Sequence, residues 1–253
     1  MSARNQSLDV LRAAAILLVL GRHLDYYTHW REVGWIGVDL FFVLSGFLVS
    51  GLLFQEYAQT GALNVRRFIL RRGLKIWPSF YVFMVFVGII VFCYGLPVRP
   101  YLLSLVFAQN YMLDGPPIAT MHTWSLAVEE HFYLLLPFLL LVLARRGIDR
   151  PFRAIPGICA TVFSLCLALR LWQGIPQGII YTQTHLRVDG LFCGVALSYA
   201  FYFHRSIFRQ LRSLICDIQV EALPEEGGRI PTTADHPPPS GAMHSAARCP
   251  GYR

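Results

Sequence analysis

The chain has 253 residues, a formal net charge of +7 and a hydrophobic content of 55%. It is long enough for several membrane helices, and its apolar content argues against an ordinary water-soluble domain. The positive charge does not indicate nucleic-acid binding, because the arginines fall in short segments between apolar runs rather than on one basic face interleaved with aromatic residues.

Six apolar runs are long enough to cross a lipid bilayer, for which a helix needs about 17–25 residues. They cover residues 8–24, 34–54, 77–96, 124–144, 154–173 and 187–204. No small-residue cleavage site follows the first run, so we predict a retained helix rather than a signal peptide. The sequence therefore predicts an all-α polytopic transmembrane bundle of about six spans.

Three basic segments indicate which ends of these helices face the cytoplasm. The segments are residues 56–75, 145–153 and 204–212. If all three are cytoplasmic, the N-terminus is cytoplasmic too, and the chain lies outside both before and after the shorter apolar run at 101–113. That run therefore cannot cross the membrane once, and we predict a re-entrant, half-spanning or interfacial segment.

The composition changes near residue 216, and we place the domain boundary at 212/213. Residues 213–253 are rich in proline and glycine and show no helical or strand periodicity, so we expect a disordered tail. Residues 1–212 would then form the transmembrane domain.

The first apolar run carries two ionisable residues, Arg12 and His23, eleven positions apart. Eleven residues make almost three helical turns, so both side chains share one face, about 16 Å apart along the axis. An ionisable residue inside a membrane costs at least ~2.5 kcal/mol and usually faces a polar interior, so the pair predicts a site. A structural alternative for Arg12 is an ion pair with Asp9.

Further polar residues begin the fourth and sixth runs at the same predicted depth as His23. They are His122, Trp124, Ser125, Glu129, His185, Arg187 and Asp189. Histidine is the commonest general base, and a carboxylate or arginine can orient it, so this set could move a proton. The alternatives are a few structural ion pairs, or side chains that extend to the membrane surface. The latter is our interpretation of three more histidines, His29, His131 and His204.

Several common catalytic templates are absent from the sequence. It has no G-x-S-x-G elbow, no glycine-rich phosphate loop and no H-E-x-x-H pair, and its six cysteines lack C-x-x-C spacing, so we predict no metal site. Ser45 has no base near it in sequence, so close helix packing through Ser45 and Gly46 is its expected role. The basic string RRGLKIWP at 71–78 would suit a phosphate-bearing acyl donor, although membrane topology explains it equally well.

Five features of the chain occur in order with plausible spacing. They are the Arg12–His23 pair, GVDLFFVLSGFL at 37–48, LRRGLKIWPSFY at 70–81, HTWSLAVEEHFYLLLP at 122–137 and RVDGLFCG at 187–194. Together they resemble the membrane-bound acyltransferase-3 family over residues 6 to about 204. The resemblance implies a plasma-membrane enzyme that moves an acyl group, usually acetyl, from acyl-CoA to a hydroxyl of a carbohydrate or similar cell-envelope acceptor. It implies no bound cofactor, with acyl-CoA as co-substrate.

The resemblance also implies roles for the residues that match the family motifs. His23 corresponds to the catalytic base, and Arg12 and Glu129 are expected to complete the catalytic set. The donor-binding residues would be Arg71, Arg72 and Lys75. The residues expected to bind the acceptor substrate are His122, Trp124, Ser125, Arg187 and Asp189.

The chain departs from the family pattern at two points. Lys75 stands where arginine is common, which keeps the charge but loses the bidentate fork. Family members usually continue with further spans after the RxDGL motif, so we expect a domain that is incomplete at its C-terminus, through truncation or a frameshift. An inactive remnant with a structural role is therefore one alternative. A proton-coupled transporter is another, because intramembrane histidine, glutamate and arginine also suit a proton relay.

Overall fold

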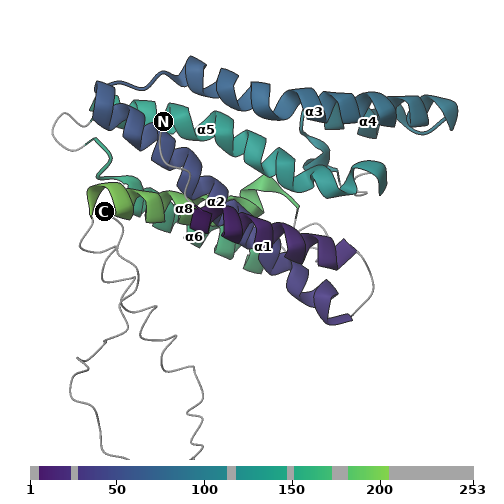
Figure 1. Ribbon diagram of the computed structural model, residues 1–253, viewed down its shortest axis with the longest axis horizontal. Helices are drawn as coiled ribbons and strands as arrows, with labels where there is room; N and C mark the ends of the chain where they lie inside the picture. Colours follow the sequence, from purple (N-terminus) through teal and green to yellow (C-terminus); the bar gives the residue numbers. More distant parts are fainter. Residues whose placement is uncertain (1–5, 24–27, 113–117, 147–150, 173–181, 205–253) are drawn as a thin grey trace, which may run out of the picture. The chain divides into compact units, whose positions relative to one another are not determined.

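A computed structural model describes residues 6–23, 28–112, 118–146, 151–172 and 182–204 (Figure 1). In these ranges the chain is helical, and the predicted all-α class is confirmed. The elements are α1 (Gln6–His23), α2 (Thr28–Thr60), α3 (Val65–Cys93), α4 (Val98–Leu105), η1 (Gln109–Tyr111), η2 (Ile118–Thr123), α5 (Trp124–Arg146), α6 (Ile155–Trp172) and α8 (Thr184–Phe203). The predicted boundary at 212/213 and the tail at 213–253 lie outside the described residues and stay predictions.

Five helices of the described part are long and apolar enough to cross a membrane. They contain Gly34–Thr60, Val65–Cys93, Trp124–Arg146, Ile155–Trp172 and Thr184–Phe203. α1 is a further helix of 18 residues whose apolar sequence is interrupted by Asp9, Arg12 and Arg22. The chain is therefore an integral membrane protein, and its helices accommodate the expected number of about six spans.

The α3 helix begins twelve residues before the predicted span at 77, so the basic segment 56–75 is not simply a loop. The side chain of Asn64 accepts a hydrogen bond from the backbone N–H of Arg67 at 2.9 Å and caps the helix. Pro78 lies inside α3 without ending it. Proline is tolerated in membrane helices because neighbouring groups can satisfy the backbone it leaves unpaired.

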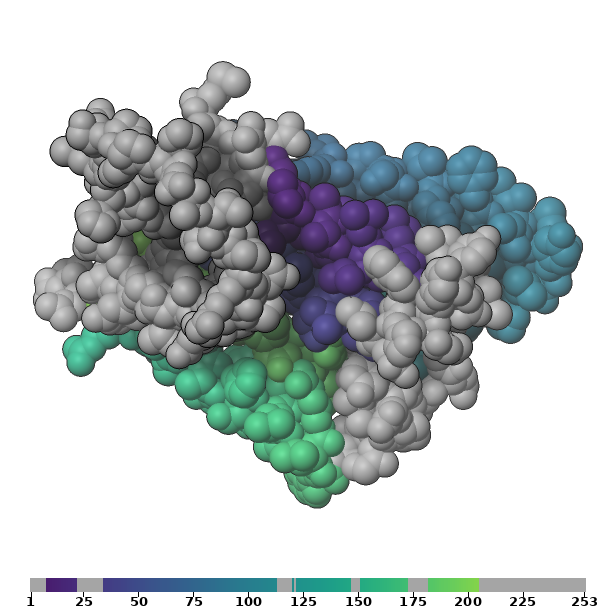
Figure 2. Space-filling view, turned by 60° about the horizontal axis from the view of Figure 1, so that its bottom comes forward, coloured from purple at the N-terminus to yellow at the C-terminus, as the bar shows by residue number. Residues whose placement is uncertain are grey.

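The centre of the bundle is the pair α2 and α8, which pack through glycines. A Cβ atom at Gly46 would overlap the carbonyl oxygen of Leu191, and one at Gly194 would overlap the carbonyl oxygen of Val43. The two backbones can approach this closely because neither glycine has a side chain. α1 lies along α2 and α6 along α8, α5 packs against both central helices, and α3 packs against α5. Figure 2 shows α1 (purple) and α6 (green) on the surface of this bundle.

After α3 the chain turns back along the same helix instead of crossing again, and α4 lies beside the end of α3 in Figure 1. Tyr101 of α4 lies against Gly88, and the ring of Phe107 stacks on Phe80 with centroids 4.5 Å apart. The stretch of α3 from Gly88 to Phe80 is about 12 Å long, so the segment returns to near the middle of α3. There Phe107 adopts a φ of 58° and the chain turns into η1. The described chain therefore turns back along α3 after one pass, and its re-entrant, half-spanning or interfacial position in a membrane stays a prediction.

Aromatic contacts bring several helix ends together at one end of the bundle. Phe54 of α2 contacts Phe152, which precedes α6, and Phe203 at the end of α8, with ring centroids 5.2 and 5.4 Å apart. α3 begins and α5 finishes at this same end, because Arg72 lies against Tyr133 and Trp77 against Glu130. The described parts of the basic segments predicted to share one side of the membrane therefore share one end of the bundle.

Candidate active site

Two buried carboxylates, Glu129 and Glu130, lie in the first two turns of α5, each 5% exposed. Tyr133 donates a hydrogen bond to Oε2 of Glu129 at 3.0 Å, and the indole N–H of Trp77 donates one to Oε2 of Glu130 at 3.0 Å. Glu130 thus faces α3, about a quarter-turn away from Glu129, as the helical spacing predicts. The Oε1 atom of each carboxylate is buried and accepts no hydrogen bond from the residues that the structure describes.

Ser45 of α2 joins this site, which the sequence did not reveal. Its Oγ lies 3.5 Å from the hydroxyl of Tyr133, the same hydroxyl that donates a hydrogen bond to Glu129. Packing alone was expected at Ser45, because the groups that it meets are more than eighty residues away in sequence. The result is a small buried network of two hydroxyls and one carboxylate between α2 and α5, suited to holding or moving a proton.

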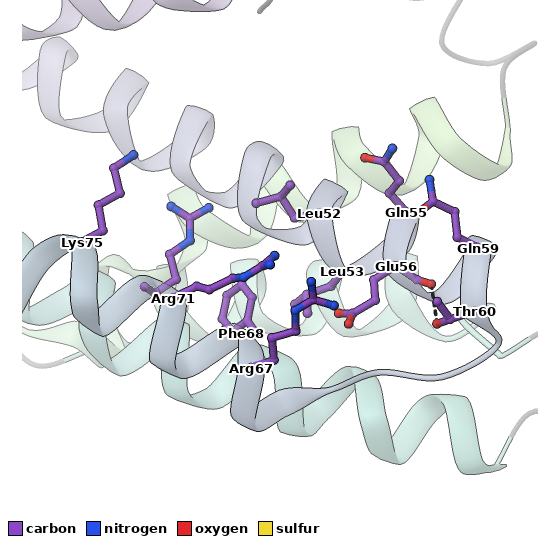
Figure 3. Close-up of a pocket in the computed structure, with 11 residues that line it drawn as sticks. Leu52, Leu53, Gln55, Glu56, Gln59, Thr60, Arg67, Phe68, Arg71 and Lys75 are labelled. Carbon is purple, nitrogen blue, oxygen red and sulfur yellow. Dashed lines mark hydrogen bonds between the residues drawn. The ribbon is translucent and has the colours of Figure 1, made fainter. Parts of the chain in front are cut away.

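A pocket of about 540 Å³ lies between the end of α2 and the start of α3 (Figure 3). Arg67, Arg71, Arg72 and Lys75 line it from α3, and Glu56 is the acidic residue among its lining side chains. The apolar part of the wall comes from Leu52, Leu53 and Phe68. The three predicted donor-binding residues thus meet in one strongly basic pocket, which we call the basic pocket.

Arg72 connects the basic pocket with the buried carboxylates. It is half-buried, and its guanidinium carbon lies 5.6 Å from the centroid of the Tyr133 ring. Its charge also acts on both Glu129 and Glu130. The carboxylate site and the pocket are therefore neighbours within the bundle.

Two of the predicted acceptor-binding residues, Trp124 and Arg187, meet around Phe42 of α2. The centroid of the Phe42 ring lies 6.0 Å from that of Trp124 and 5.9 Å from the guanidinium carbon of Arg187. Arg187 is 8% exposed and forms an ion pair with Asp39. Asp39 was not identified from the sequence, although a lone carboxylate within the apolar string GVDLFFVLSGFL was a visible signal.

The other predicted acceptor-binding residues lie apart from this cluster. Asp189 forms an ion pair with Arg170 of α6 at 2.7 Å, so it joins α6 to α8. The His122 ring packs against Phe83 of α3 with centroids 5.6 Å apart. Ser125 is half-buried in the first turn of α5. Binding of the acceptor by these residues stays a prediction.

His131, which we expected to extend to the membrane surface, is half-buried and forms a polar contact with another helix. Its Nδ1 lies 2.8 Å from Oγ1 of Thr184, which also accepts a hydrogen bond from the Asn110 side chain at 2.8 Å. The ring of Tyr111 packs against those of both His131 and His185, with centroid distances of 6.2 and 5.7 Å. This polar contact fastens η1 to α5 and α8.

Arg12 and His23 both lie in the single helix α1, as their spacing requires. Arg12 is half-buried, and the next turn, at Ala15, packs against Gly37 of α2. The side chain of His23 lies outside the described part of the chain. The catalytic roles of Arg12, His23 and Glu129 therefore remain predictions.

Comparison with known proteins places this bundle in a family. A family model described as an acyltransferase domain matches residues 5–216. The peptidoglycan O-acetyltransferase OatA of Listeria monocytogenes is 30% identical to the chain over 224 residues, which cover 79% of this chain and 34% of that protein. A Staphylococcus aureus protein named as a candidate O-acetyltransferase is 33% identical to the chain over 207 residues, which cover 76% of this chain and 34% of that protein.

A third relative is YrhL of Bacillus subtilis, named as a candidate peptidoglycan O-acetyltransferase. It is 36% identical over 150 residues, which cover 53% of this chain and 23% of that protein. The chain thus spans about a third of the length of the first curated relatives it matches. No solved structure matches it. The family model covers most of the sequence, and the chain belongs to the acyltransferase-3 family of integral membrane proteins.

Proposed function

We propose that this protein transfers an acyl group, most simply acetyl, from acyl-CoA to a hydroxyl of a cell-envelope carbohydrate. Family membership supports the reaction class, and the names of the relatives favour a peptidoglycan sugar as the acceptor. The structural observation that carries the choice of donor is the basic pocket, where four cations from one helix face a single carboxylate.

The basic pocket has the chemistry that a coenzyme A thioester needs. Guanidinium groups bind phosphate through charge-assisted, often paired hydrogen bonds, and the pocket holds three arginines and one lysine. Its volume of about 540 Å³ is within the usual range for small-molecule sites. Leu52, Leu53 and Phe68 offer apolar contacts for the uncharged part of the donor.

In the proposed reaction His23 accepts the proton of the acceptor hydroxyl as the oxygen attacks the thioester carbonyl. The carbon–sulfur bond then breaks, and the coenzyme A thiolate leaves and takes up a proton, so that an ester and free coenzyme A result. Arg12 would place positive charge on the same face of α1. Glu129 would hold the hydroxyl of Tyr133, which in turn contacts Ser45, in one arrangement beside the donor.

A direct test uses purified protein, labelled acetyl-CoA and peptidoglycan oligosaccharides. The wild-type chain should form a labelled ester on the sugar, and His23→Ala should reduce its formation at least ~100-fold, a typical contribution of a general base. Retained wild-type turnover in His23→Ala would eliminate His23 as the base. Absence of any transfer would point to an inactive remnant. Uptake of the sugar without acylation, by lipid vesicles that contain the protein, would point to a transporter.

Arg71→Gln should raise the KM for acetyl-CoA while leaving kcat nearly unchanged. Arg71 lines the basic pocket, and a hydrogen bond to a charged group is worth about 1.5–3 kcal/mol, which corresponds to roughly a tenfold to hundredfold change. Steady-state kinetics at varied acetyl-CoA concentration measures this effect. Arg145→Gln is the control, because Arg145 is exposed at the end of α5 and does not line the pocket. Equal KM values for Arg71→Gln and wild type would contradict the donor site.

The proposed orientation has the N-terminus and the basic pocket on the cytoplasmic side. Single cysteines at positions 71 and 96, in a chain whose own six cysteines are replaced, should then differ in their labelling. A membrane-impermeant maleimide applied to intact cells should label Leu96→Cys and should reach Arg71→Cys only after the membrane is opened. Labelling of both positions from the same side, or the reverse pattern, would contradict this topology.

A further inference from the structure

The four cations of the basic pocket are not equivalent. Arg67, Arg71 and Lys75 are four residues apart, form one ridge of α3 and are exposed. Phe68 and Arg72 form the neighbouring ridge, which faces α5. Among the described residues, Arg72 is the cation whose charge acts on both Glu129 and Glu130.

Arg72 reaches the catalytic carboxylate through an aromatic ring. Its guanidinium carbon lies 5.6 Å from the centroid of Tyr133 and 6.0 Å from that of Phe68, distances at which a cation is attracted to the ring face. The hydroxyl of the same tyrosine donates to Glu129 at 3.0 Å. Arg72 therefore helps to hold Tyr133, and Tyr133 helps to hold Glu129.

A bound phosphate and the two carboxylates would compete for one guanidinium. Arginine keeps its charge in a protein, and its guanidinium is one rigid group, so it cannot move toward a phosphate in the pocket and toward the carboxylates at the same time. Glu129 and Glu130 are both buried, each with one oxygen that accepts no hydrogen bond from the described residues. Any movement of the Arg72 guanidinium toward the pocket therefore weakens its electrostatic attraction to Glu129 and Glu130.

We propose that Arg72 is a positioning residue that couples phosphate binding in the basic pocket to the Tyr133–Glu129 pair. This inference rests on the proposed donor site. A donor phosphate attracts the guanidinium of Arg72 away from Tyr133. The side chains of Tyr133, Ser45 and Glu129 can then interact with substrate, and they do so only while the donor is bound. Since such coupling is reciprocal, removing the negative charge of Glu129 must strengthen donor binding, and must do so through Arg72.

The test is a double-mutant cycle on the binding of coenzyme A to the purified full-length chain, measured by calorimetry. Glu129→Gln should tighten binding about fivefold or more, the lower end of typical coupling between sites. In an Arg72→Gln background the same change should have no effect on the Kd. In an Arg71→Gln background it should tighten binding as much as in the wild type, because Arg71 lines the pocket without acting on Glu129.

The possible outcomes separate this inference from the proposed function. If coenzyme A does not bind the wild-type chain, the proposed donor site is wrong, and the proposed coupling is wrong as well. If coenzyme A binds but Glu129→Gln tightens binding equally with and without Arg72, or not at all, the coupling is wrong and the donor site stands. Gel filtration checks that each variant is folded, and Arg72→Met, which also removes the charge, replaces any Arg72→Gln protein that aggregates.

Discussion

Replacing Glu129 with glutamine is expected to lower kcat for acyl transfer at least ~100-fold, because an amide cannot take up or release the proton that the buried network of Glu129, Tyr133 and Ser45 is suited to hold or move. The protein should remain folded, because the glutamine oxygen can still accept the hydrogen bond from Tyr133. What disappears is one negative charge at a position only 5% exposed, where solvent screens it poorly. Steady-state turnover of labelled acetyl-CoA by the purified variant measures the effect.

Glu130→Gln is the matched control for this substitution. Glu130 is equally buried and adjacent in sequence, but it faces α3 and accepts its hydrogen bond from Trp77. Its loss should reduce kcat much less than the loss of Glu129, since Tyr133 and Ser45 are left in place. Wild-type kcat in Glu129→Gln, or the same loss in both variants, would show that Glu129 has no special part in the reaction.

Gly194→Ala should destabilise the bundle by about 3 kcal/mol, the upper end of the cost of overpacking. A Cβ atom at this position would overlap the carbonyl oxygen of Val43 and lie 2.5 Å from the backbone nitrogen of Phe47. Both neighbours are backbone atoms of α2, so the conflict can be relieved only by separating α2 from α8. Unfolding of the purified protein in detergent, followed by circular dichroism, measures the loss.

Gly157→Ala on α6 provides the control for a glycine without such a neighbour. A Cβ atom there meets nothing within 4 Å. Alanine is favoured over glycine by up to ~1 kcal/mol inside a helix, so stability should be unchanged or slightly higher. If Gly194→Ala were as stable as Gly157→Ala, close glycine packing would not hold the central helix pair together.

Much of the fold was predictable because hydropathy and charge act locally along the chain. Apolar runs revealed the long helices. Placing all three basic segments on one side of the membrane left no single crossing for residues 101–113, which indicated that this segment turns back. The start of α3 was not predicted, because basic charge was taken to indicate a loop. Arginine and lysine are in fact good helix formers, and the cap at Asn64 lies before them.

The site was predictable only where its parts are close in sequence. Arg71, Arg72 and Lys75 lie within two turns of one helix, so their convergence on one pocket followed from helical spacing. Pairs such as Asp39 with Arg187 depend on how distant helices are rotated against one another. Hydropathy fixes which segments are helices and leaves that rotation open, so the partners of Asp39 and Ser45 were visible only in the structure.

The most direct test of the proposed function separates donor from acceptor across a membrane. The protein is placed in lipid vesicles that enclose peptidoglycan oligosaccharides, and labelled acetyl-CoA is added outside. Molecules whose basic pocket faces outward should transfer label to the enclosed sugar, and Glu129→Gln should abolish this transfer. The proposed account has the donor pocket at one end of the bundle and the acceptor at the other, beside the proposed base His23 at the far end of α1. Ester that forms only when donor and sugar are on the same side, or no ester at all, would contradict this account.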